Sequence, residues 1–270
     1  MTDFHTFSKQ IRLRVLELCN QKRTSHIGGA FSVADVLAVL YGDVLDVHPE
    51  KIDDPSRDRL FYSKGHACTA LYAALELRGF FQGKDLLKEF TENGSYFTSH
   101  INHRLPGVEL STGSLGHALG VACGTAVACK RRQMRNTVCA ILSDGELDEG
   151  SNWEAILFAA HNRLDNLMVV IDFNKIQSFG TVKEVMDLDP LADKFRAFNW
   201  DVEEVDGHST EDLQEVLTRF KSARSGRPKC LIAHTVKGKG VSFMENDLLW
   251  HYRSPSDQDV QRAREELESA

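Results

Sequence analysis

The 270-residue sequence lacks both a long apolar run and an excess of positive charge. Its longest apolar stretch, 115–129, is shorter than the about 20 residues that a membrane-spanning helix needs, and it contains His117. The 32 basic residues are outnumbered by 39 acidic ones, which argues against a nucleic-acid-binding surface. The first residues form neither a basic nor an apolar segment, so no signal peptide is predicted. We therefore expect a cytoplasmic protein that binds neither membranes nor nucleic acid.

The sequence also lacks Cys-x-x-Cys pairs, low-complexity segments and internal repeats. Most of its six cysteines lie in apolar runs, which is typical of small buried residues in a reducing compartment. The length is sufficient for one domain with a core of its own.

Apolar patterns typical of strands and of helices alternate along the chain. Short β-branched runs indicate buried parallel strands, and amphipathic segments between them indicate helices. We therefore predict the α/β class, with a doubly wound, mostly parallel sheet and helices on both faces. Ser32 is expected to cap a helix that continues to about Tyr41. The expected strands are 59–62, 137–142, 167–172, 201–205 and 229–234, and the main expected helices are 7–20, 66–79, 84–91, 114–132, 151–163, 190–198, 210–222 and 257–270.

Two polar residues, Asp144 and Asn174, follow neighbouring predicted strands. Asp144 stands in the turn Ser143-Asp144-Gly145-Glu146, and Asn174 ends the apolar run that begins near residue 167. Because parallel strands end at the same edge of a sheet, we expect the two side chains to meet there. A carboxylate and an amide oxygen are hard ligands suited to Mg²⁺ beside a diphosphate, and Gly145 would let the backbone approach that diphosphate.

This stretch resembles the thiamine-diphosphate motif, which begins with a Gly-Asp-Gly turn and ends with Asn. Ser143 replaces the first glycine of the motif. An Asp-Gly turn alone is also compatible with an ordinary surface turn between a strand and a helix. The strand frame, the spacing and Asn174 favour the cofactor motif.

Further segments resemble transketolase, and they occur in the order of that family. Residues 24–32 are similar to its Ser-Gly-His-Pro-Gly segment, and residues 63–67 to its second histidine loop. Residues 105–109 and 111–116 are close to its Leu-Pro-Gly-Val-Glu and Thr-Gly-Pro-Leu-Gly runs. Residues 236–241 and 250–251 complete a resemblance that extends from about residue 10 to about residue 255.

The resemblance implies a site for thiamine diphosphate and Mg²⁺, with Ca²⁺ or Mn²⁺ as possible substitutes. Asp144 and Asn174 would bind the metal through side-chain oxygens, and Ile176 through its backbone carbonyl. Backbone amides of Gly145 and Glu146 would contact the diphosphate. The other implied cofactor-binding residues are His66, Gly113, Ser114, Leu115 and Glu149.

Four histidines match the active-site set of the family: His26, His66, His100 and His251. A neutral imidazole is suited to moving protons between sugar hydroxyls and carbonyls near pH 7. The resemblance implies proton transfer by His26 and His251, a hydrogen bond from His100 to the donor sugar, and a place for His66 beside the diphosphate. Each could instead be structural, and the match is least close around His251. The remaining histidines are expected to be mostly structural.

Two features indicate a subunit boundary. Gly116, Gly120 and Gly124 form a stripe of small residues on the predicted helix 114–132. This stripe fits either tight packing within the domain or contact with another subunit, as in the family. Glu149 occupies a position that the family uses at its dimer interface, beside the catalytic glutamate of the other half; an exposed first-turn glutamate is the alternative.

The sequence resembles only the first of three transketolase domains. We therefore expect residues 1–270 to form one diphosphate-binding domain, with the pyrimidine-binding and C-terminal domains on a partner chain. The glutamate that activates the cofactor would lie on that partner, so this chain alone should be inactive and should assemble as an α₂β₂ heterotetramer. The implied reaction transfers a two-carbon ketol unit from a ketose phosphate to an aldose phosphate, in the pentose phosphate pathway or a specialised sugar route.

Two other functions are compatible with the cofactor motif. The α subunit of a 2-oxo acid dehydrogenase or decarboxylase has the same turn, but it is not expected to carry segments 63–66 and 105–109. A non-catalytic cofactor-binding or regulatory subunit would not need four histidines. The sequence favours transketolase and leaves the identity of the sugar phosphates open.

Overall fold

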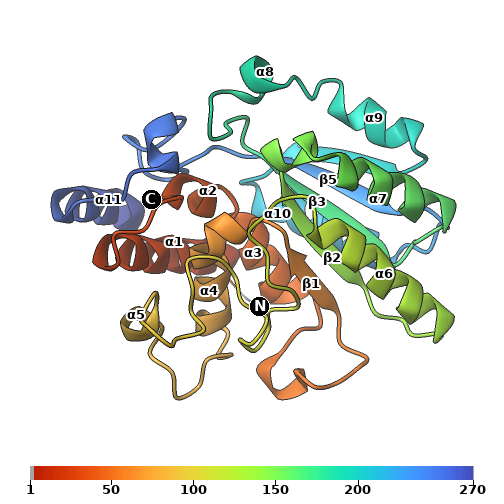
Figure 1. Cartoon of the computed structure of the whole chain (residues 1–270), viewed down its shortest axis with the longest axis horizontal. Coiled ribbons are helices and arrows are strands. Elements are labelled where there is room, and N and C mark those ends of the chain that lie inside the picture. Colours follow the sequence, from red (N-terminus) through yellow and green to blue (C-terminus); the bar gives the residue numbers. More distant parts are fainter. Residues whose placement is uncertain (1–2, 270) are drawn as a thin grey trace.

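The computed structural model describes residues 3–269 and has a sheet of five parallel strands in the order β1-β2-β3-β5-β4 (Figure 1). The strands expected at 59–62 and 229–234 have those bounds, and the other three extend slightly beyond the predicted C-terminal ends. The strand predictions are confirmed. The observed strands are β1 (Arg59–Tyr62), β2 (Val138–Ser143), β3 (Leu167–Phe173), β4 (Asp201–Asp206) and β5 (Lys229–His234).

Helices pack on both faces of the sheet, which confirms the predicted α/β class (Figure 1). One hydrophobic cluster joins the sheet to α1, α3, α4, α10 and α11, and a second joins its other face to α6, α7 and α9. The bounds are α1 (Phe4–Gln21), α3 (Ala34–Val39), α4 (Cys68–Leu77), α6 (Ala118–Arg131), α7 (Gly150–His161), α9 (Leu191–Ala197), α10 (Thr210–Ser222) and α11 (Asp257–Ser269).

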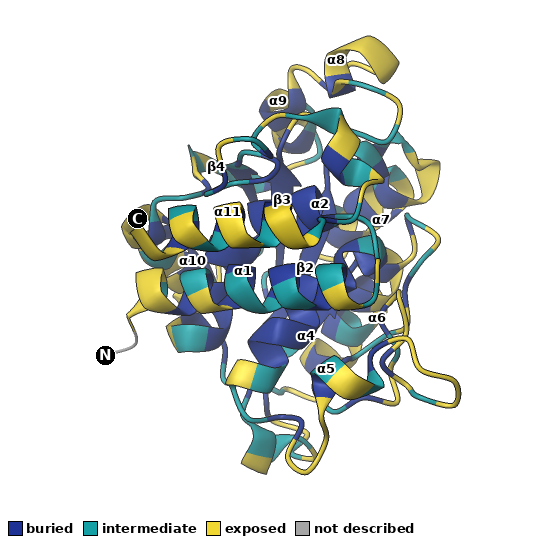
Figure 2. Ribbon diagram, turned by 90° about the vertical axis from the view of Figure 1, so that its left-hand side faces the viewer, coloured by how far each residue is buried: buried dark blue, intermediate teal, exposed yellow. Residues whose placement is uncertain are grey.

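The central strands β2 and β3 are apolar except for Ser143 and Asp172 near their carboxyl ends, because both of their faces are covered. Along β3, Met168 and Val170 belong to one hydrophobic cluster, whereas Val169 and Ile171 belong to the other. All residues of β2 and β3 are buried, and Figure 2 shows these strands in the interior behind the partly exposed helices α1 and α11. Two-sided burial explains why continuous apolar runs, rather than alternating patterns, predicted these strands.

One helix prediction is wrong: Ser32 does not cap a helix that begins there. It is the last residue of α2 (Ile27–Ser32), and α3 begins after Val33. The Ser32 hydroxyl donates to the Asp172 carboxylate at 2.6 Å and lies 3.1 Å from the Gly29 carbonyl. Asp172, which lies far along the sequence, therefore accepts from the hydroxyl that was expected to cap the helix. Sequence order alone could not show this contact.

Short helical segments connect the main elements, and the pattern of apolar residues had left several of them out. The short segments are η1 (Leu40–Val44), η2 (Pro49–Lys51), η3 (Gly65–Ala67), α5 (Leu86–Glu89), η4 (Gly145–Asp148), α8 (Val182–Val185) and η5 (Leu248–His251).

No helix within residues 3–269 has the combination of length and hydropathy that a membrane crossing requires.

The carboxyl ends of the five parallel strands lie at one edge of the sheet. Ser143 at the end of β2 pairs with Asp172 of β3, and Phe173 pairs with His234 of β5. The segments that follow β1, β2, β3 and β5 therefore begin side by side. Such an edge is where open parallel sheets bind ligands.

Candidate active site

Asp144 and Asn174 come together at this edge, as the sequence predicted. One Asp144 carboxylate oxygen accepts from the Gly145 amide at 2.7 Å, and the other accepts from the Lys175 amide at 2.5 Å. Lys175 follows Asn174 directly, so the turn after β2 is bound to the turn after β3. The Asn174 side-chain oxygen accepts from the Ile176 amide at 3.2 Å. The three predicted metal ligands thus belong to one hydrogen-bonded unit.

The environment of Asp144 fits a site for a divalent cation. Burial and then the negative charge of Asp172 raise the pKa of Asp144 to about 7. A bound dication would favour the ionised form. Within residues 3–269, no cluster of three or more His, Cys, Asp or Glu side chains is placed to hold a metal. A metal here would therefore depend on the Asn174 amide oxygen, the Ile176 carbonyl and oxygens of a bound ligand, which are hard donors suited to Mg²⁺.

Lys237 connects this unit to the histidines. Its ammonium donates to the Ile176 carbonyl at 3.0 Å and lies 2.8 Å from His251 Nδ1. The side chain is buried, and burial lowers the pKa of Lys237 to about 8, against the opposing attraction of Asp144. The lysine is mainly protonated at pH 7, so His251 Nδ1 accepts and the ring hydrogen lies on Nε2.

A second buried carboxylate, Asp172, organises the floor of the site. It forms a buried ion pair with Lys64 and accepts from the hydroxyls of Ser32 and Thr235. The Asn174 amide also donates to it at 3.4 Å. Burial favours the neutral acid, but the Lys64 ammonium and the two hydroxyls hold the pKa of Asp172 below its usual value. The network is satisfied internally, so its role is to fix the turns around it.

The structure brings all four predicted histidines together from separate segments. The ring centre of His26 lies 5.0 Å from that of His251, 5.4 Å from that of His66 and 6.4 Å from that of His100. The His66 and His251 rings are 6.1 Å apart. The His26 amide donates to the His251 carbonyl at 3.0 Å, which joins the first segment of the cluster to the last.

Three of the four histidines, His26, His66 and His251, are held in their uncharged form. Burial, followed by the charges of His100 and Lys237, lowers the pKa of His26 to about 4. Burial, followed by Lys237 and His26, lowers the pKa of His251 to about 3. Burial and nearby Lys64 also hold the pKa of His66 well below its usual value. Near pH 7 these imidazoles are neutral and can both donate and accept a proton.

His26 adopts a strained backbone conformation at the entrance to α2. Its φ of 69° lies in the left-handed region, which non-glycine residues rarely adopt. Its ring nitrogen Nδ1 lies 2.9 Å from the Ser25 hydroxyl. Such strain persists where surrounding contacts fix it and is frequent at functional sites.

The predicted loop residues 113–115 lie near the histidines. A side chain at Gly113 would stand 3.3 Å from the His100 ring, so the two segments are in contact. A side chain at Gly65 would collide with the Thr112 carbonyl at 2.4 Å, which explains the glycine there. Ser114 is exposed and Leu115 is partly buried. Their contact with a cofactor stays a prediction.

The two predicted glutamates have different surroundings. The buried Glu146 carboxylate accepts from the Ser63 hydroxyl and from the Gly116 amide, at 2.8 Å for the latter. These bonds tie together three loops of the site, so only the Glu146 backbone is left for the predicted diphosphate contact. Glu149 is exposed and occupies the position just before α7, where its side chain makes no capping hydrogen bond. A side chain at Gly116 would stand 2.8 Å from Glu149 Cβ, which places Glu149 beside the start of α6.

Sequence reasoning assigned no role to Lys64, Asp172 or Lys237. All three are nevertheless buried at the site. Lys64 and Lys237 stand within segments 63–67 and 236–241, which the resemblance already singled out. Asp172 interrupts an apolar strand, and a charge in a fully buried strand is itself an indication of a paired polar group.

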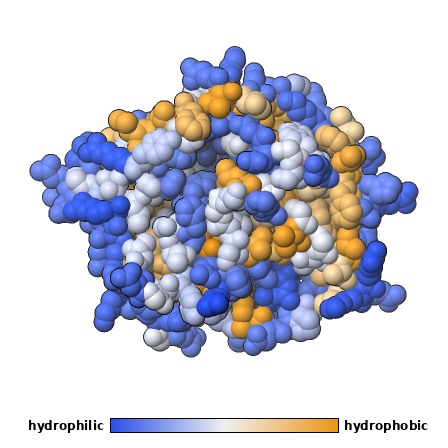
Figure 3. Space-filling model, in the orientation of Figure 1, coloured by the Kyte–Doolittle hydropathy of each residue, from blue (hydrophilic) through white to orange (hydrophobic). Residues whose placement is uncertain are grey.

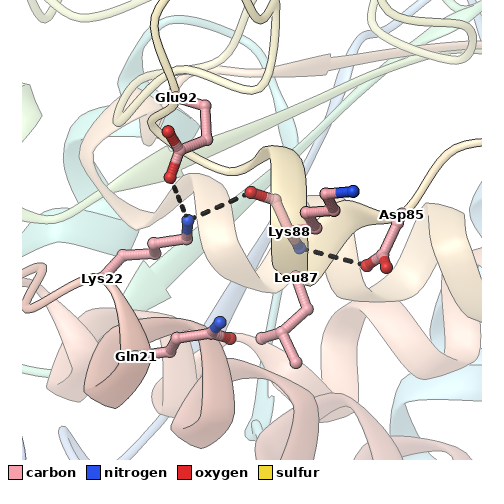
Figure 4. A pocket seen from close by; sticks show the side chains of 6 residues that line it. All are labelled: Gln21, Lys22, Asp85, Leu87, Lys88 and Glu92. Atoms are coloured by element: carbon pink, nitrogen blue, oxygen red, sulfur yellow. Dashed lines mark hydrogen bonds and ion pairs between the residues drawn. The ribbon is translucent and has the colours of Figure 1, made fainter.

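Two surface pockets lie away from these residues. Figure 4 shows one of about 400 Å³, where Lys22 lies between Glu92, at 2.5 Å, and the Lys88 carbonyl, at 3.1 Å. The Lys22 charge is paired with Glu92, and the pocket contains none of the four histidines. The other is a mainly apolar pocket of about 420 Å³ beside Trp153 and Phe198. The edge of the sheet, rather than either pocket, is the candidate active site.

The fold and these groups define a parallel α/β domain with a polar site at the carboxyl edge of its sheet. The family model of the transketolase thiamine diphosphate binding domain matches residues 5–269. A 6-deoxy-6-sulfo-D-fructose transketolase subunit of Clostridium sp. (strain MSTE9) is 40% identical, with 96% of this chain and 94% of that protein covered. An apulose-4-phosphate transketolase subunit of Phocaeicola vulgatus is 39% identical, with 96% and 92% covered.

Transketolase from Campylobacter jejuni has the same fold, with a TM-score of 0.93 and 27% sequence identity. The match covers 99% of this chain but 43% of that one. The present chain therefore belongs to the transketolase family. It corresponds to nearly the whole length of the two subunit relatives and to less than half of the solved transketolase.

Proposed function

We propose that this chain is the N-terminal subunit of a two-chain transketolase that transfers a two-carbon ketol unit from a ketose phosphate to an aldose phosphate. The proposal depends above all on the convergence of four histidines beside the Asp144–Asn174 unit. A domain that only held a cofactor would not need several neutral imidazoles at one edge. The similar subunits from Clostridium and Phocaeicola support the same assignment.

Thiamine diphosphate and Mg²⁺ are the cofactors we assign to this edge. Bound thiamine diphosphate would supply the ring that stabilises negative charge on the substrate carbon, and the chain would supply binding and orientation. Asp144, Asn174 and the Ile176 carbonyl would hold the metal. Backbone amides of Gly145 and Glu146 would bind the diphosphate, with further contacts from His66, Gly113, Ser114 and Leu115.

The histidines would handle the sugar. His26 and His251 would move protons at the hydroxyl and carbonyl oxygens where the carbon–carbon bond breaks or forms. Because Lys237 occupies Nδ1 of His251, this ring would present its Nε2 hydrogen to the substrate. The exposed His100, at the outer side of the cluster, would hydrogen-bond the donor sugar, and His66 would lie between sugar and cofactor.

A partner chain would complete the site, and the surface of α6 and α7 is where we place it. Figure 3 shows apolar surface along the side of the molecule that these helices form. Val121, Leu157 and Phe158 are 43%, 57% and 46% exposed there. A methyl group added at Gly120 or Gly124 would meet no atom of residues 3–269 within 4 Å, so these glycines do not serve packing within the domain.

This surface would join the subunits into the α₂β₂ assembly predicted above. Glu149 borders it and would contact the glutamate that the partner contributes. We also infer that residues 1–270 form one diphosphate-binding domain, with the pyrimidine-binding and C-terminal domains on the partner. The six cysteines are free and buried, which fits a reducing compartment such as the cytoplasm.

The ketose is the least determined part of the function. The two subunit relatives are almost equally similar to this chain, yet their names specify a sulfo-sugar and a branched sugar phosphate. Similarity at that level therefore does not fix the substrate. The residues that select the sugar's distal group would lie largely on the partner.

The deciding experiment is an activity assay with the chain alone, with the chain encoded beside it, and with both together. Thiamine diphosphate and Mg²⁺ are supplied, ribose 5-phosphate is the acceptor, and xylulose 5-phosphate, apulose 4-phosphate and 6-deoxy-6-sulfofructose are tested as donors. Ketol transfer only in the mixture is the expected result. Decarboxylation of pyruvate instead would indicate a 2-oxo acid enzyme, and cofactor binding with no turnover would indicate a non-catalytic subunit.

A further inference from the structure

A buried polar network joins His208 to α1, α3 and the segment that follows β5. Asp35 of α3 accepts from the Arg12 guanidinium of α1 at 3.1 Å, and its other oxygen lies 2.7 Å from His208 Nδ1. Burial favours the neutral acid, but the Arg12 charge and the His208 contact hold the pKa of Asp35 well below its ordinary value. Asp35 is therefore an anion that accepts from the imidazole ring.

The two ring nitrogens of His208 have different partners, and these fix its tautomer. The Val236 amide donates to His208 Nε2 at 2.8 Å. A backbone N–H can only donate, so Nε2 is the unprotonated acceptor and the ring hydrogen lies on Nδ1, directed at Asp35. The side chain is 10% exposed, so solvent does not compete strongly for either bond.

The amide that His208 holds belongs to the segment that carries Lys237. Val236 directly precedes Lys237, and the Gly238 amide on the other side donates to the Gly28 carbonyl at 3.0 Å. The backbone around Lys237 is thus held by one hydrogen bond from each neighbour and by the Asn246 amide, which donates to the Lys237 carbonyl at 2.9 Å. His208 supplies the acceptor on one side, although it comes from the turn after β4, which lies at the far end of the sheet from β1.

The side chain of Lys237 is closely packed along its length. A methyl group at Gly28 would stand 3.0 Å from Lys237 Cγ, tighter than an ordinary contact, so the lysine packs closely against this glycine. Its ammonium then meets the Ile176 carbonyl and His251 Nδ1. A shift of the Val236 amide would move the ammonium away from the ring that it orients. A displacement of about 1 Å at a reacting group can cost about 10²-fold in rate.

We infer that His208 is a positioning residue: oriented by Asp35, it holds the Val236 amide and so sets the place at which Lys237 meets His251. The inference rests on the proposed function, because it assigns His208 to the same reaction. The buried Asp35 carboxylate is thereby linked to His251 through the His208 ring, the Val236 amide and the Lys237 ammonium.

Two substitutions separate this role from a merely structural one. In His208→Gln the side-chain oxygen can occupy the place of Nε2 and accept from Val236. In His208→Asn the side-chain amide can occupy the place of Nδ1 and donate to Asp35, but no acceptor reaches Val236. His234→Gln is the matched control, because His234 also pairs with a carboxylate, Glu204 at 3.0 Å, at the end of the neighbouring strand.

The first measurement is steady-state kinetics of the assembled enzyme with Mg²⁺, thiamine diphosphate, xylulose 5-phosphate and ribose 5-phosphate. We expect His208→Asn to lower kcat about tenfold to a hundredfold, with KM for the donor changed by less than about threefold. His208→Gln and His234→Gln should stay within about threefold of the wild-type kcat. Should His208→Asn fail to fold, His208→Thr, which also lacks an acceptor for Val236, takes its place.

The second measurement needs no activity. Nitrogen NMR of the histidine rings in the full chain reports whether His251 Nδ1 accepts a hydrogen bond. His208→Asn should shift the His251 Nδ1 resonance, and His208→Gln should restore it. An unshifted resonance and an unchanged kcat in His208→Asn would overturn the inference, as would equal losses in the asparagine and glutamine variants. If His208→Asn shifts the His251 Nδ1 resonance but the assembled wild type transfers no ketol unit, the proposed function is refuted, and with it the role of His208 in catalysis.

Discussion

Strand β5 has a buried lysine at each end, and the two lysines differ in what surrounds them. Lys229 begins the strand and donates to the backbone carbonyls of Ala223 and Asp165, the former at 2.7 Å. Lys237 follows the strand and contacts Ile176 and His251. Burial lowers the pKa of each to about 8. The same pKa shift therefore occurs in a structural lysine at one end of the strand and in a lysine of the candidate active site at the other. The groups that each lysine contacts, rather than its pKa, distinguish the two roles.

The difference extends to the whole of each edge of the sheet. At the amino edge, the Asn136 amide donates to the carbonyls of Pro55 and Arg57, and Asp58 accepts from the Thr137 amide at 2.7 Å. Lys221 pairs with Asp58 at 2.8 Å. These contacts hold the loops of the amino edge to one another. The carboxyl edge instead gathers several groups with shifted pKa values, namely Asp144, whose pKa is raised, and His26, His66 and His251, whose pKa values are lowered. Such clusters are common where proteins bind and react.

The largest contrast is expected for a histidine substitution at each edge. His26→Asn should lower kcat/KM of the assembled enzyme by about 10²- to 10⁴-fold, because a positioned proton-transfer group is lost. His48→Asn, beside β1 at the amino edge, should leave kcat/KM unchanged. Steady-state kinetics and calorimetric cofactor binding separate the steps. Weaker cofactor binding in His26→Asn, with kcat restored to the wild-type value at saturating thiamine diphosphate, would contradict the catalytic assignment.

An aspartate exchange at each edge should give the next largest contrast. Asp144→Ala should weaken Mg²⁺-dependent binding of thiamine diphosphate by more than about a hundredfold, since loss of even an outer partner of a metal ligand costs 10- to 100-fold. Asp165→Ala removes a carboxylate that pairs with Lys130 at 2.8 Å and should leave cofactor affinity unchanged. Calorimetric titration with and without EDTA measures both. Tight Mg²⁺-dependent binding by Asp144→Ala would exclude this residue as a ligand.

Lys229 offers a smaller effect, on stability alone. Lys229→Met keeps most of the buried side-chain volume but leaves the Asp165 and Ala223 carbonyls without their donor. The free energy of unfolding should fall by about 1–3 kcal/mol, the cost of unsatisfied buried acceptors. Urea unfolding followed by circular dichroism gives the value, and cofactor affinity should not change. A variant that is as stable as the wild type would mean that other donors replace the lysine.

Much of the fold could be predicted from the sequence because the central strands are buried on both faces. Continuous apolar runs in β2 and β3 therefore marked strands, and polar residues directly after them marked the functional edge. The same reasoning placed Asp144 and Asn174 together from the sequence alone. The four histidines required the family resemblance, because nothing local to His26 or His100 relates them to each other.

The contacts that the sequence could not show are those between distant buried polar groups. The failed cap at Ser32 and the unassigned Asp172 are two ends of one hydrogen bond between residues far apart in the chain. His208, expected to be structural, acquires its place only from Asp35 and Val236, which lie on other segments. Periodicity and capping rules describe neighbours in sequence, whereas these partners are set by the register of the sheet.

An effect of similar size, but dependent on pH, is expected for Asp144 in the chain without metal or cofactor. Its folded pKa of about 7 lies above the ordinary value of 3.8, so between these values the folded chain holds a proton that the unfolded chain releases. The stability that this proton contributes is present at low pH and is lost as pH rises through 7. Asp144→Asn does not titrate, so its advantage in unfolding free energy should grow from pH 5 to pH 8, to about 1–3 kcal/mol.

Histidine titration does not obscure this comparison. The folded pKa of His26, about 4, lies below the ordinary value of 6.5, so its contribution falls as pH decreases through that interval. That contribution has the opposite sign and is common to wild type and variant, so it cancels in their difference. Thermal melts of the two proteins in EDTA at several pH values measure the difference directly. A flat difference would contradict the raised pKa; adding Mg²⁺ and thiamine diphosphate should reverse the order, because only the wild type gains binding free energy.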